Sequence, residues 1–228
     1  MTTPKRRSRR TKAGPRPTTI QSAVLRSRLM SRGGFDVYEG LVDNGFQQHL
    51  LNEAKTQYAE AVACDIAVSD GQEGRGGVPE RRFLTSPGGV VQASFYRGRW
   101  VVEFLRDLTV PELVPSGERG TYSYYVRPGD FLGIHRDIVA CDVAVITCLT
   151  NGIVDGVSDG GNLCLYPERI AEPLSAIRAT PENGALKLHL KPGQTIVMYG
   201  GIVPHSLLPV TNGQERIVSV LCYKIPNA

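Results

Sequence analysis

The sequence predicts a mainly β (α+β) fold: a double-stranded β-helix, or jelly roll, braced by helices on its N-terminal side. Two observations support this. Before about residue 120, apolar residues recur at helical spacing, whereas from residue 121 onward short β-type runs alternate with turns. Eight such runs favour an antiparallel double sheet, and the helical segments would then cover one of its outer faces.

The expected strands are runs of aliphatic, aromatic and β-branched residues. They are Thr121–Val126, Phe131–His135, Asp142–Leu149, Gly161–Tyr166, Ala185–Leu190, Gln194–Tyr199, Val203–Leu208 and Arg216–Ile225. Gly combined with Pro, Asn or Asp marks four of the turns between them. These turns are at 127–130, 159–161, 191–193 and 211–213.

Helices are expected at residues 18–31, about 44–64 and 100–108, from the spacing of their apolar residues. Asp43 or Asn44 is a suitable N-cap for the second. Residues 69–89 are rich in Gly, Glu, Arg and Pro, which is typical of a long mobile loop. Such a loop is suited to be a lid, and Arg75, Arg81 and Arg82 are its candidates to receive an anionic group of a substrate.

The bulk composition is that of one soluble domain. The chain has 228 residues, 41% hydrophobic and 21% charged, and no apolar run approaches the roughly 18 residues that span a bilayer. Its five cysteines form no CxxC pair, so neither a zinc knuckle nor a disulfide framework is indicated. Free or buried thiols in a reducing compartment are expected, which favours the cytoplasm.

The charge is divided unevenly along the chain. Residues 1–35 hold ten of the 26 basic residues and none of the 22 acidic ones, so the remainder has a net charge of −6. We expect 1–35 to be a basic, disordered tail and 36–228 to be a single domain with its jelly-roll core at about 121–226. The alternatives for the tail are a nucleic-acid or anionic-surface contact, a nuclear address or a mitochondrial presequence.

Four residues in the β-type region carry the chemistry. His135 and Asp137 are two residues apart, His205 lies near the start of the seventh expected strand, and Arg216 opens the eighth. Two imidazoles and one carboxylate can occupy one face of an octahedral metal, the facial triad of non-haem Fe(II) oxygenases. A guanidinium is a planar fork suited to a ligand carboxylate.

The region from Tyr122 to Tyr223 resembles the Fe(II)/2-oxoglutarate-dependent oxygenases, and most closely their prolyl-hydroxylase-like branch. The matching motifs are Tyr124-Tyr125, then Gly133-Ile134-His135-Arg136-Asp137, Gly160-Gly161-Asn162-Leu163-Cys164-Leu165-Tyr166-Pro167, Lys191-Pro192-Gly193, Pro204-His205-Ser206 and Arg216. The resemblance implies that His135, Asp137 and His205 hold Fe(II) and that Arg216 binds 2-oxoglutarate. It further implies consumption of O2, with ascorbate as a further candidate cofactor. Because Asp137 is a carboxylate, and not the small residue of halogenating relatives, hydroxylation is favoured.

One position departs from the family pattern. Many relatives have a serine two residues after the arginine, where this chain has Val218, and Ser219 should point to the opposite face of its strand. The hydroxyl group that assists Arg216 must therefore come from elsewhere. Tyr125, Tyr124 and Thr147 are the candidates.

The substrate is less well indicated. A small molecule such as an amino acid or biosynthetic intermediate is expected first, and a prolyl or other protein residue second. Nucleic acid is disfavoured except through the basic tail, because the second arginine typical of the demethylase branch is absent after Arg216. A cupin-like metalloenzyme independent of 2-oxoglutarate, or a non-catalytic protein that binds through the tail, are the alternatives from other classes.

Overall fold

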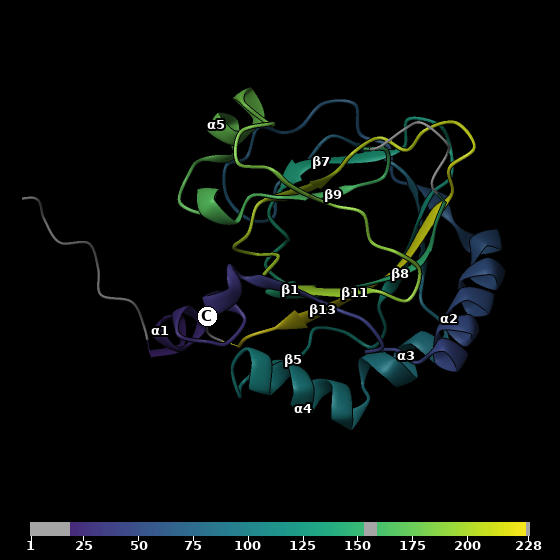
Figure 1. Ribbon diagram of the computed structural model, residues 1–228, viewed down its shortest axis with the longest axis horizontal. Helices are drawn as coiled ribbons and strands as arrows, with labels where there is room; N and C mark the ends of the chain where they lie inside the picture. The colour runs from purple at the N-terminus through teal and green to yellow at the C-terminus, as the bar shows by residue number, and fades with distance from the viewer. Residues whose placement is uncertain (1–18, 153–158, 227–228) are drawn as a thin grey trace, which may run out of the picture.

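Two antiparallel sheets face each other in the computed structural model, which describes residues 19–152 and 159–226 (Figure 1). In the described residues the larger sheet has the order β1-β11-β8-β13-β6-β4-β2, with β5 pairing with β13, and the smaller sheet has the order β10-β9-β12-β7-β3. The strands are β1 (Phe35–Tyr38), β2 (Val62–Ala63), β3 (Arg81–Arg82), β4 (Leu84–Pro87), β5 (Val114–Pro115), β6 (Thr121–Tyr125), β7 (Phe131–His135), β8 (Val143–Asn151), β9 (Leu163–Leu165), β10 (Leu186–Leu188), β11 (Thr195–Met198), β12 (His205–Leu207) and β13 (Arg216–Lys224).

Helices cover the outer face of the larger sheet. Figure 1 shows α3 and α4 beneath it and α2 at one end. The helices are α1 (Thr19–Leu25), α2 (Asn44–Gln57), α3 (Val90–Tyr96), α4 (Arg99–Leu108) and α5 (Leu174–Ala179), with 3-10 turns at Met30–Arg32, Tyr58–Glu60 and Pro167–Arg169. The predicted cap of α2 is confirmed, because the Asp43 carboxylate accepts a hydrogen bond from the Phe46 amide at 2.9 Å.

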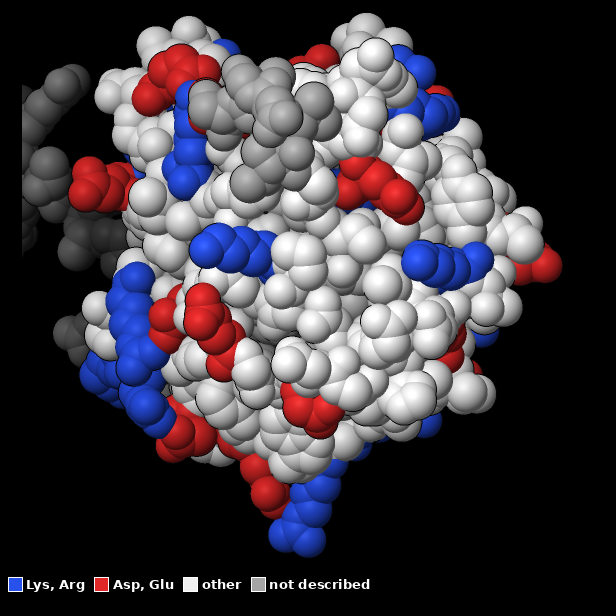
Figure 2. All heavy atoms as spheres, turned by 45° about the vertical axis from the view of Figure 1, so that its right-hand side comes forward, with Lys and Arg blue, Asp and Glu red and all other residues white. Residues whose placement is uncertain are grey.

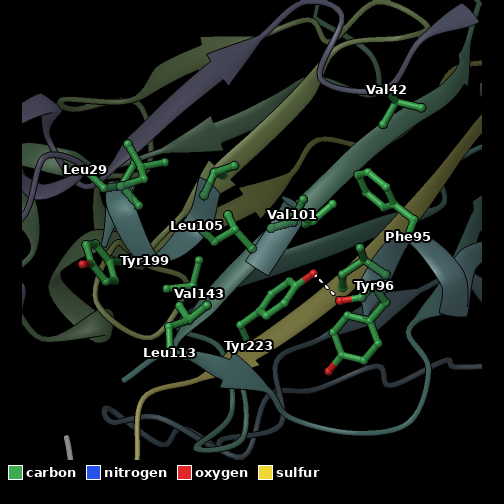
Figure 3. Packing of buried hydrophobic residues seen from close by; sticks show 14 of the residues in the cluster. Leu29, Val42, Phe95, Tyr96, Val101, Leu105, Leu113, Val143, Tyr199 and Tyr223 are labelled. Carbon is green, nitrogen blue, oxygen red and sulfur yellow. Dashed lines mark hydrogen bonds between the residues drawn. The ribbon is translucent and has the colours of Figure 1, made fainter. Parts of the chain in front are cut away.

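The main hydrophobic core lies between these helices and the larger sheet (Figure 3). Val101 and Leu105 of α4 are fully buried there. Tyr223 of β13 is also buried, and its hydroxyl donates to the Tyr96 carbonyl of α3 at 2.9 Å, so its one polar group is satisfied. This packing closes one face of the larger sheet and leaves the other to form the interior with the smaller sheet.

The jelly-roll prediction is confirmed, and all eight expected strands are present. Sequence patterns missed β1 to β5, α3 and α5. The predicted loop at 69–89 is wrong in its second half, because β3 and β4 lie there and pair with β7 and β6. Strands as short as β2, β3 and β5 are too short to show a period and exist only because a neighbouring strand supplies their hydrogen bonds.

The predicted boundary of the N-terminal tail needs correction. Residues 1–18 lie outside the described part of the chain, but residues 19–35 belong to the folded domain. Val24 of α1 and Leu29 are buried in the main core, and Phe35 begins β1. The apolar side chains in this segment find a hydrophobic surface on the domain, which its basic composition concealed.

The prediction that the cysteines are free is wrong for two of them. Cys141, just before β8, and Cys222 of β13 form a disulfide with a Cα–Cα distance of 4.8 Å. The pairing of β8 with β13 brings the two together across 81 residues of sequence. Cys64, Cys148 and Cys164 are free. The cytoplasmic location, which was inferred from free thiols, stays a prediction with weaker support.

One face of the molecule carries charged residues of both signs. Figure 2 shows the face with α2, where basic and acidic residues lie scattered among uncharged ones. Among the helices of residues 19–152 and 159–226, none has the length and apolar character needed to cross a membrane.

The disulfide gives a direct chemical prediction. Alkylation of the denatured, unreduced protein should label three cysteines, and five after reduction, as measured by intact mass. Because the bridge closes a long loop in the unfolded chain, Cys222→Ser should lower the free energy of unfolding by about 2–4 kcal/mol. Cys64→Ser, at a free cysteine, is the matched control. Labelling of all five without reduction would contradict the bridge.

Candidate metal centre

Two histidines from neighbouring strands face each other inside the barrel. His135 ends β7 and His205 begins β12, and the two residues are directly opposed in the antiparallel register. Their ring centroids are 4.2 Å apart. Because side chains of directly opposed residues point to the same face of a sheet, this register places both imidazoles in the interior.

Asp137 completes the cluster from the loop after β7. Its Oδ1 lies 3.5 Å from Nε2 of His135 and 3.6 Å from Nε2 of His205. Its amide donates to the Gly200 carbonyl at 2.8 Å. Gly200 also provides the space for the carboxylate, because a Cβ at that position would lie 1.8 Å from Oδ2 of Asp137. The ligand atoms of the three residues all lie within 4.8 Å of one another.

The hydrogen bonds of both imidazoles prepare them as ligands. Nδ1 of His135 lies 2.8 Å from the Gly133 carbonyl, and Nδ1 of His205 lies 2.9 Å from the Val203 carbonyl. A carbonyl oxygen only accepts, so in the neutral ring Nδ1 carries the proton and Nε2 keeps its lone pair towards Asp137. Backbone carbonyls are common outer partners of metal-bound histidines.

The three side chains are strongly coupled electrostatically. Burial and the neighbouring His205 lower the pKa of His135. Burial works against protonation of His205 as well, but the Asp137 carboxylate outweighs it and raises the pKa of His205 above its ordinary value. Burial would raise the pKa of Asp137, yet the two histidines hold it well below its usual range. The cluster therefore presents a carboxylate at neutral pH, as cation binding requires.

A largely apolar cavity extends from this cluster between the two sheets. Its volume is about 170 Å³. The inner faces of both sheets line it, with Phe83, Ser123, Tyr125, Leu132, His135, Asp137, Ala144, Ile146, Leu163, His205, Ser206, Leu207, Arg216, Val218 and Val220. The space is below the 300–1,000 Å³ of pockets for drug-sized ligands, so it suits a small molecule.

Arg216 brings a buried cation into the same cavity. Arg216 is only 3% exposed. Within the described residues, its Nε has no hydrogen-bond partner and its guanidinium forms no ion pair. The guanidinium lies over the Tyr125 ring, 5.5 Å from the centroid. A buried charge without a partner is costly, so the cavity is suited to an anion that pairs with this group.

The neighbours of Arg216 that could ionise remain neutral. Burial, assisted by the Arg216 charge, lowers the pKa of His189. Burial raises the pKa of the Cys148 thiol to about 11. The Cys148 thiol is therefore not an anionic partner of Arg216 near pH 7, and the neutral His189 ring adds no second positive charge, which leaves the guanidinium charge for a ligand.

The structure brings together five of the seven residues that the sequence indicated: the triad, Arg216 and Tyr125. Burial raises the pKa of Tyr125 to about 12, so its hydroxyl stays protonated. The prediction that Tyr124 assists Arg216 is wrong. Tyr124 directly precedes Tyr125 on β6, and consecutive residues of a strand point to opposite faces of the sheet. The Tyr124 hydroxyl donates to the Ala54 carbonyl of α2 at 2.8 Å, within the helix-covered core.

The prediction that the Thr147 hydroxyl assists Arg216 is also wrong. That hydroxyl is hydrogen-bonded to the Thr195 hydroxyl at 2.9 Å, and Thr147 does not line the cavity. On β8, Ala144 and Ile146 line the cavity, so the alternation of side chains turns Thr147 to the outer face. Ser219 points away as expected, since its hydroxyl accepts from Gln92 of α3 at 2.8 Å.

Ser123 is a cavity residue that the sequence did not reveal. It lies on β6 directly opposite Val218 of β13, the position where the family pattern has a serine. Opposed residues have Cβ atoms about 4.5–5.5 Å apart, so the Ser123 hydroxyl occupies nearly the same region of the cavity. No local signal could have identified it, because its role depends on the register between β6 and β13.

The residues present fit a divalent metal and a dicarboxylic acid. The two imidazoles and one carboxylate form a facial donor set. The buried Arg216 guanidinium, which lines the same cavity, has no anionic partner in the part of the chain that the structure describes. Asp137, whose side chain is 20% exposed, is the most accessible of the three ligands. A second reactant would therefore approach from the Asp137 side.

The close fit of Gly200 against Asp137 can be tested. Gly200→Ala should weaken metal binding by roughly 10–100-fold, because the methyl group displaces the carboxylate. Anaerobic calorimetric titration with Fe(II) measures this, and thermal unfolding of the metal-free protein checks the fold. Gly117→Ala, where the nearest atom is 3.9 Å from the added carbon, is the control. Equal affinities in the two variants would contradict this account of Gly200.

Comparisons with known proteins bear on the fold. No protein-family model and no curated protein matches the chain. Among solved structures, the epimerase SnoN in complex with Fe3+, alpha ketoglutarate and nogalamycin RO is 14% identical, with a TM-score of 0.63 over 89% of this chain and 84% of that one.

Two further solved structures are similar over most of their length. EctD from S. alaskensis with bound Fe is 15% identical, with a TM-score of 0.61 over 91% of this chain and 76% of that one. A Pseudomonas putida prolyl-4-hydroxylase is 13% identical, with a TM-score of 0.58 over 86% and 95%. The resemblance that the sequence indicated is thus confirmed at the level of the fold: the chain has the fold of the Fe(II)/2-oxoglutarate-dependent oxygenases, prolyl hydroxylases among them.

Proposed function

We propose that this protein is an Fe(II)- and 2-oxoglutarate-dependent dioxygenase that hydroxylates an unactivated C–H bond of a small molecule. The observation that carries the proposal is the pairing, within one small cavity, of a His-Asp-His cluster with a buried guanidinium that has no anionic partner among residues 19–152 and 159–226. O2 and 2-oxoglutarate would be consumed, with one oxygen atom entering the substrate as a hydroxyl group and the other entering succinate, while CO2 is released.

Each residue would have a defined task. His135, Asp137 and His205 would hold Fe(II), which when bound supplies the oxidising chemistry with O2. Arg216 would pair with the distal carboxylate of 2-oxoglutarate, and Ser123 and Tyr125 would offer hydroxyl groups beside it. The apolar lining would exclude water and strengthen these interactions.

The size of the cavity bears on the substrate. A volume of about 170 Å³ suits the cosubstrate alone, so the substrate would bind outside it, on the exposed side of Asp137. An amino acid or biosynthetic intermediate is the first choice. The similar structure with nogalamycin RO is of an enzyme that acts on a small molecule, and it is described as an epimerase, so the reaction class needs its own measurement.

A prolyl or other protein residue is the second candidate. The structural similarity to a prolyl-4-hydroxylase, over 95% of that chain, favours it. A cupin-like enzyme independent of 2-oxoglutarate is less well supported, because nothing in its chemistry would require a buried arginine without an anionic partner among the described residues, as Arg216 is.

The metal and cosubstrate can be tested in sequence. Anaerobic titration with Fe(II) and then 2-oxoglutarate should produce the visible charge-transfer band of a chelate in wild-type protein. His205→Ala should lose it, because one ligand is gone, while His49→Ala, which removes an exposed histidine of α2, should keep it. Bound metal without a band would contradict dependence on 2-oxoglutarate.

Arg216 makes a prediction in two parts. Arg216→Met should raise the Kd for 2-oxoglutarate more than a hundredfold, since loss of one partner of a buried ion pair costs about 3–5 kcal/mol. The same variant without ligand should be at least as stable as wild type, because an unpaired buried charge is removed. Calorimetry and urea unfolding measure the two quantities. A strongly destabilised variant would mean that Arg216 is structural.

A further inference from the structure

A hairpin formed by residues 66–81, which we term the 66–81 hairpin, crosses the triad end of the barrel. Its base is closed by hydrogen bonds between Ile66 and Arg81 at 2.7 and 2.8 Å, and Asp70 pairs with Val78 further along. The returning arm pairs with β7, through β3 at the edge of the smaller sheet and through the Gly133 amide, which donates to the Glu80 carbonyl at 2.8 Å. Because β7 ends at His135, the tip of the hairpin extends past the metal ligands.

Arg75, at this tip, is bound to the loop that carries Asp137. Its Nε donates to the Asp137 carbonyl at 3.1 Å, and its Nη1 forms an ion pair with Asp142 at 2.5 Å. Its Nη2 donates to the carbonyls of Ile138 and Cys141 at 2.7 and 3.0 Å. One guanidinium thus spans the loop from its first residue to its last, and three of its four acceptors are main-chain carbonyls.

A glycine pair seats the two charged groups side by side. A Cβ on Gly201 would lie 2.5 Å from Cζ of Arg75, just as a Cβ on Gly200 would collide with the Asp137 carboxylate. The Asp137 carboxylate and the Arg75 guanidinium therefore rest on consecutive residues of the turn after β11. This close packing fixes the loop from the outside while the triad forms on the inside.

Other contacts hold the same region but do not replace Arg75. Arg136 links the hairpin to the segment that precedes α5, because it donates hydrogen bonds to the carbonyls of Glu73 and Glu172 at 3.1 and 2.9 Å. The Cys141–Cys222 disulfide fixes the far end of the loop to β13. Only Arg75 among these contacts bonds to Asp137 itself, through the carbonyl of that residue.

We propose that Arg75 is a positioning residue for the metal centre: it latches the 66–81 hairpin over the 137–142 loop and holds Asp137 in place to bind the metal. The inference rests on the proposed function and extends it to a residue outside the cavity. The sequence suggested instead that arginines of this region receive an anionic substrate. The four bonds of Arg75 to the protein leave its guanidinium committed to the loop, which favours positioning.

The test compares three variants. Arg75→Ala removes all four bonds, and Arg75→Lys can keep the ion pair with Asp142 but cannot reach three carbonyls at once. Arg82→Ala is the control: Arg82 lies at the base of the same hairpin, half-exposed, and faces Asp130 at 3.5 Å, a carboxylate that Arg127 also holds. Samples stay unreduced so that the disulfide is present in each.

The first measurement needs no metal. Hydrogen exchange of a peptide covering residues 136–142 should be faster in metal-free Arg75→Ala than in wild type, intermediate in Arg75→Lys and unchanged in Arg82→Ala. The second measurement is anaerobic Fe(II) affinity, which should fall by roughly 10–100-fold in Arg75→Ala, with partial recovery in Arg75→Lys. The charge-transfer band with 2-oxoglutarate should shift or weaken in the same order.

Two results would overturn the inference. Wild-type exchange at residues 136–142 in Arg75→Ala would mean that the loop is held without the latch. Faster exchange with unchanged metal affinity would mean that the latch is structural and does not position Asp137. If wild-type protein binds no metal, the proposed function fails instead, and the exchange measurement alone decides whether Arg75 holds the loop.

Discussion

The pairing of β12 with β7 is the constraint on which the rest of the site depends. It sets His135 directly opposite His205, and a shift of one residue would turn one imidazole out of the interior. Both rings then use a carbonyl two residues earlier in the chain to fix the proton on Nδ1. The geometry at these strand ends therefore determines where the two imidazoles lie and which ring nitrogen carries the proton. Asp137 only has to reach this preformed pair from the adjoining loop.

The larger sheet supplies the other half of the cavity by a second register. β13 places Arg216 opposite Tyr125 and Val218 opposite Ser123 on β6, so the cation, the aromatic ring and the hydroxyl form one cluster. Burial in an apolar space makes the unpaired guanidinium unfavourable until an anion arrives. Helix packing on the opposite face keeps this sheet in place, with residues such as Leu105 and Tyr223 fully buried. The cavity therefore depends on a core that contains none of its residues.

The metal-side loop is held differently from the strands. Between Asp137 and Asp142 there is no ladder of hydrogen bonds, so its shape depends on side chains from elsewhere: the Arg75 guanidinium, the turn at Gly200 and Gly201, and the disulfide at Cys141. Loops carry function where a scaffold fixes them. Here the scaffold comes from the 66–81 hairpin and β13, which both contact this loop.

The sequence by itself determined the eight strands from residue 121 onward, the cap of α2 and the candidate metal-binding residues, because period-two alternation, turn residues and donor chemistry are local properties. Only the tertiary structure decided which residues face the cavity. Tyr124 and Thr147 turn to the helical core, and Ser123 takes the place that Val218 leaves without a hydroxyl. It also decided the Cys141–Cys222 bridge and the contacts of Arg75 with the 137–142 loop. The physical reason is that register and loop contacts join residues far apart in the chain, and no local pattern records which partners meet.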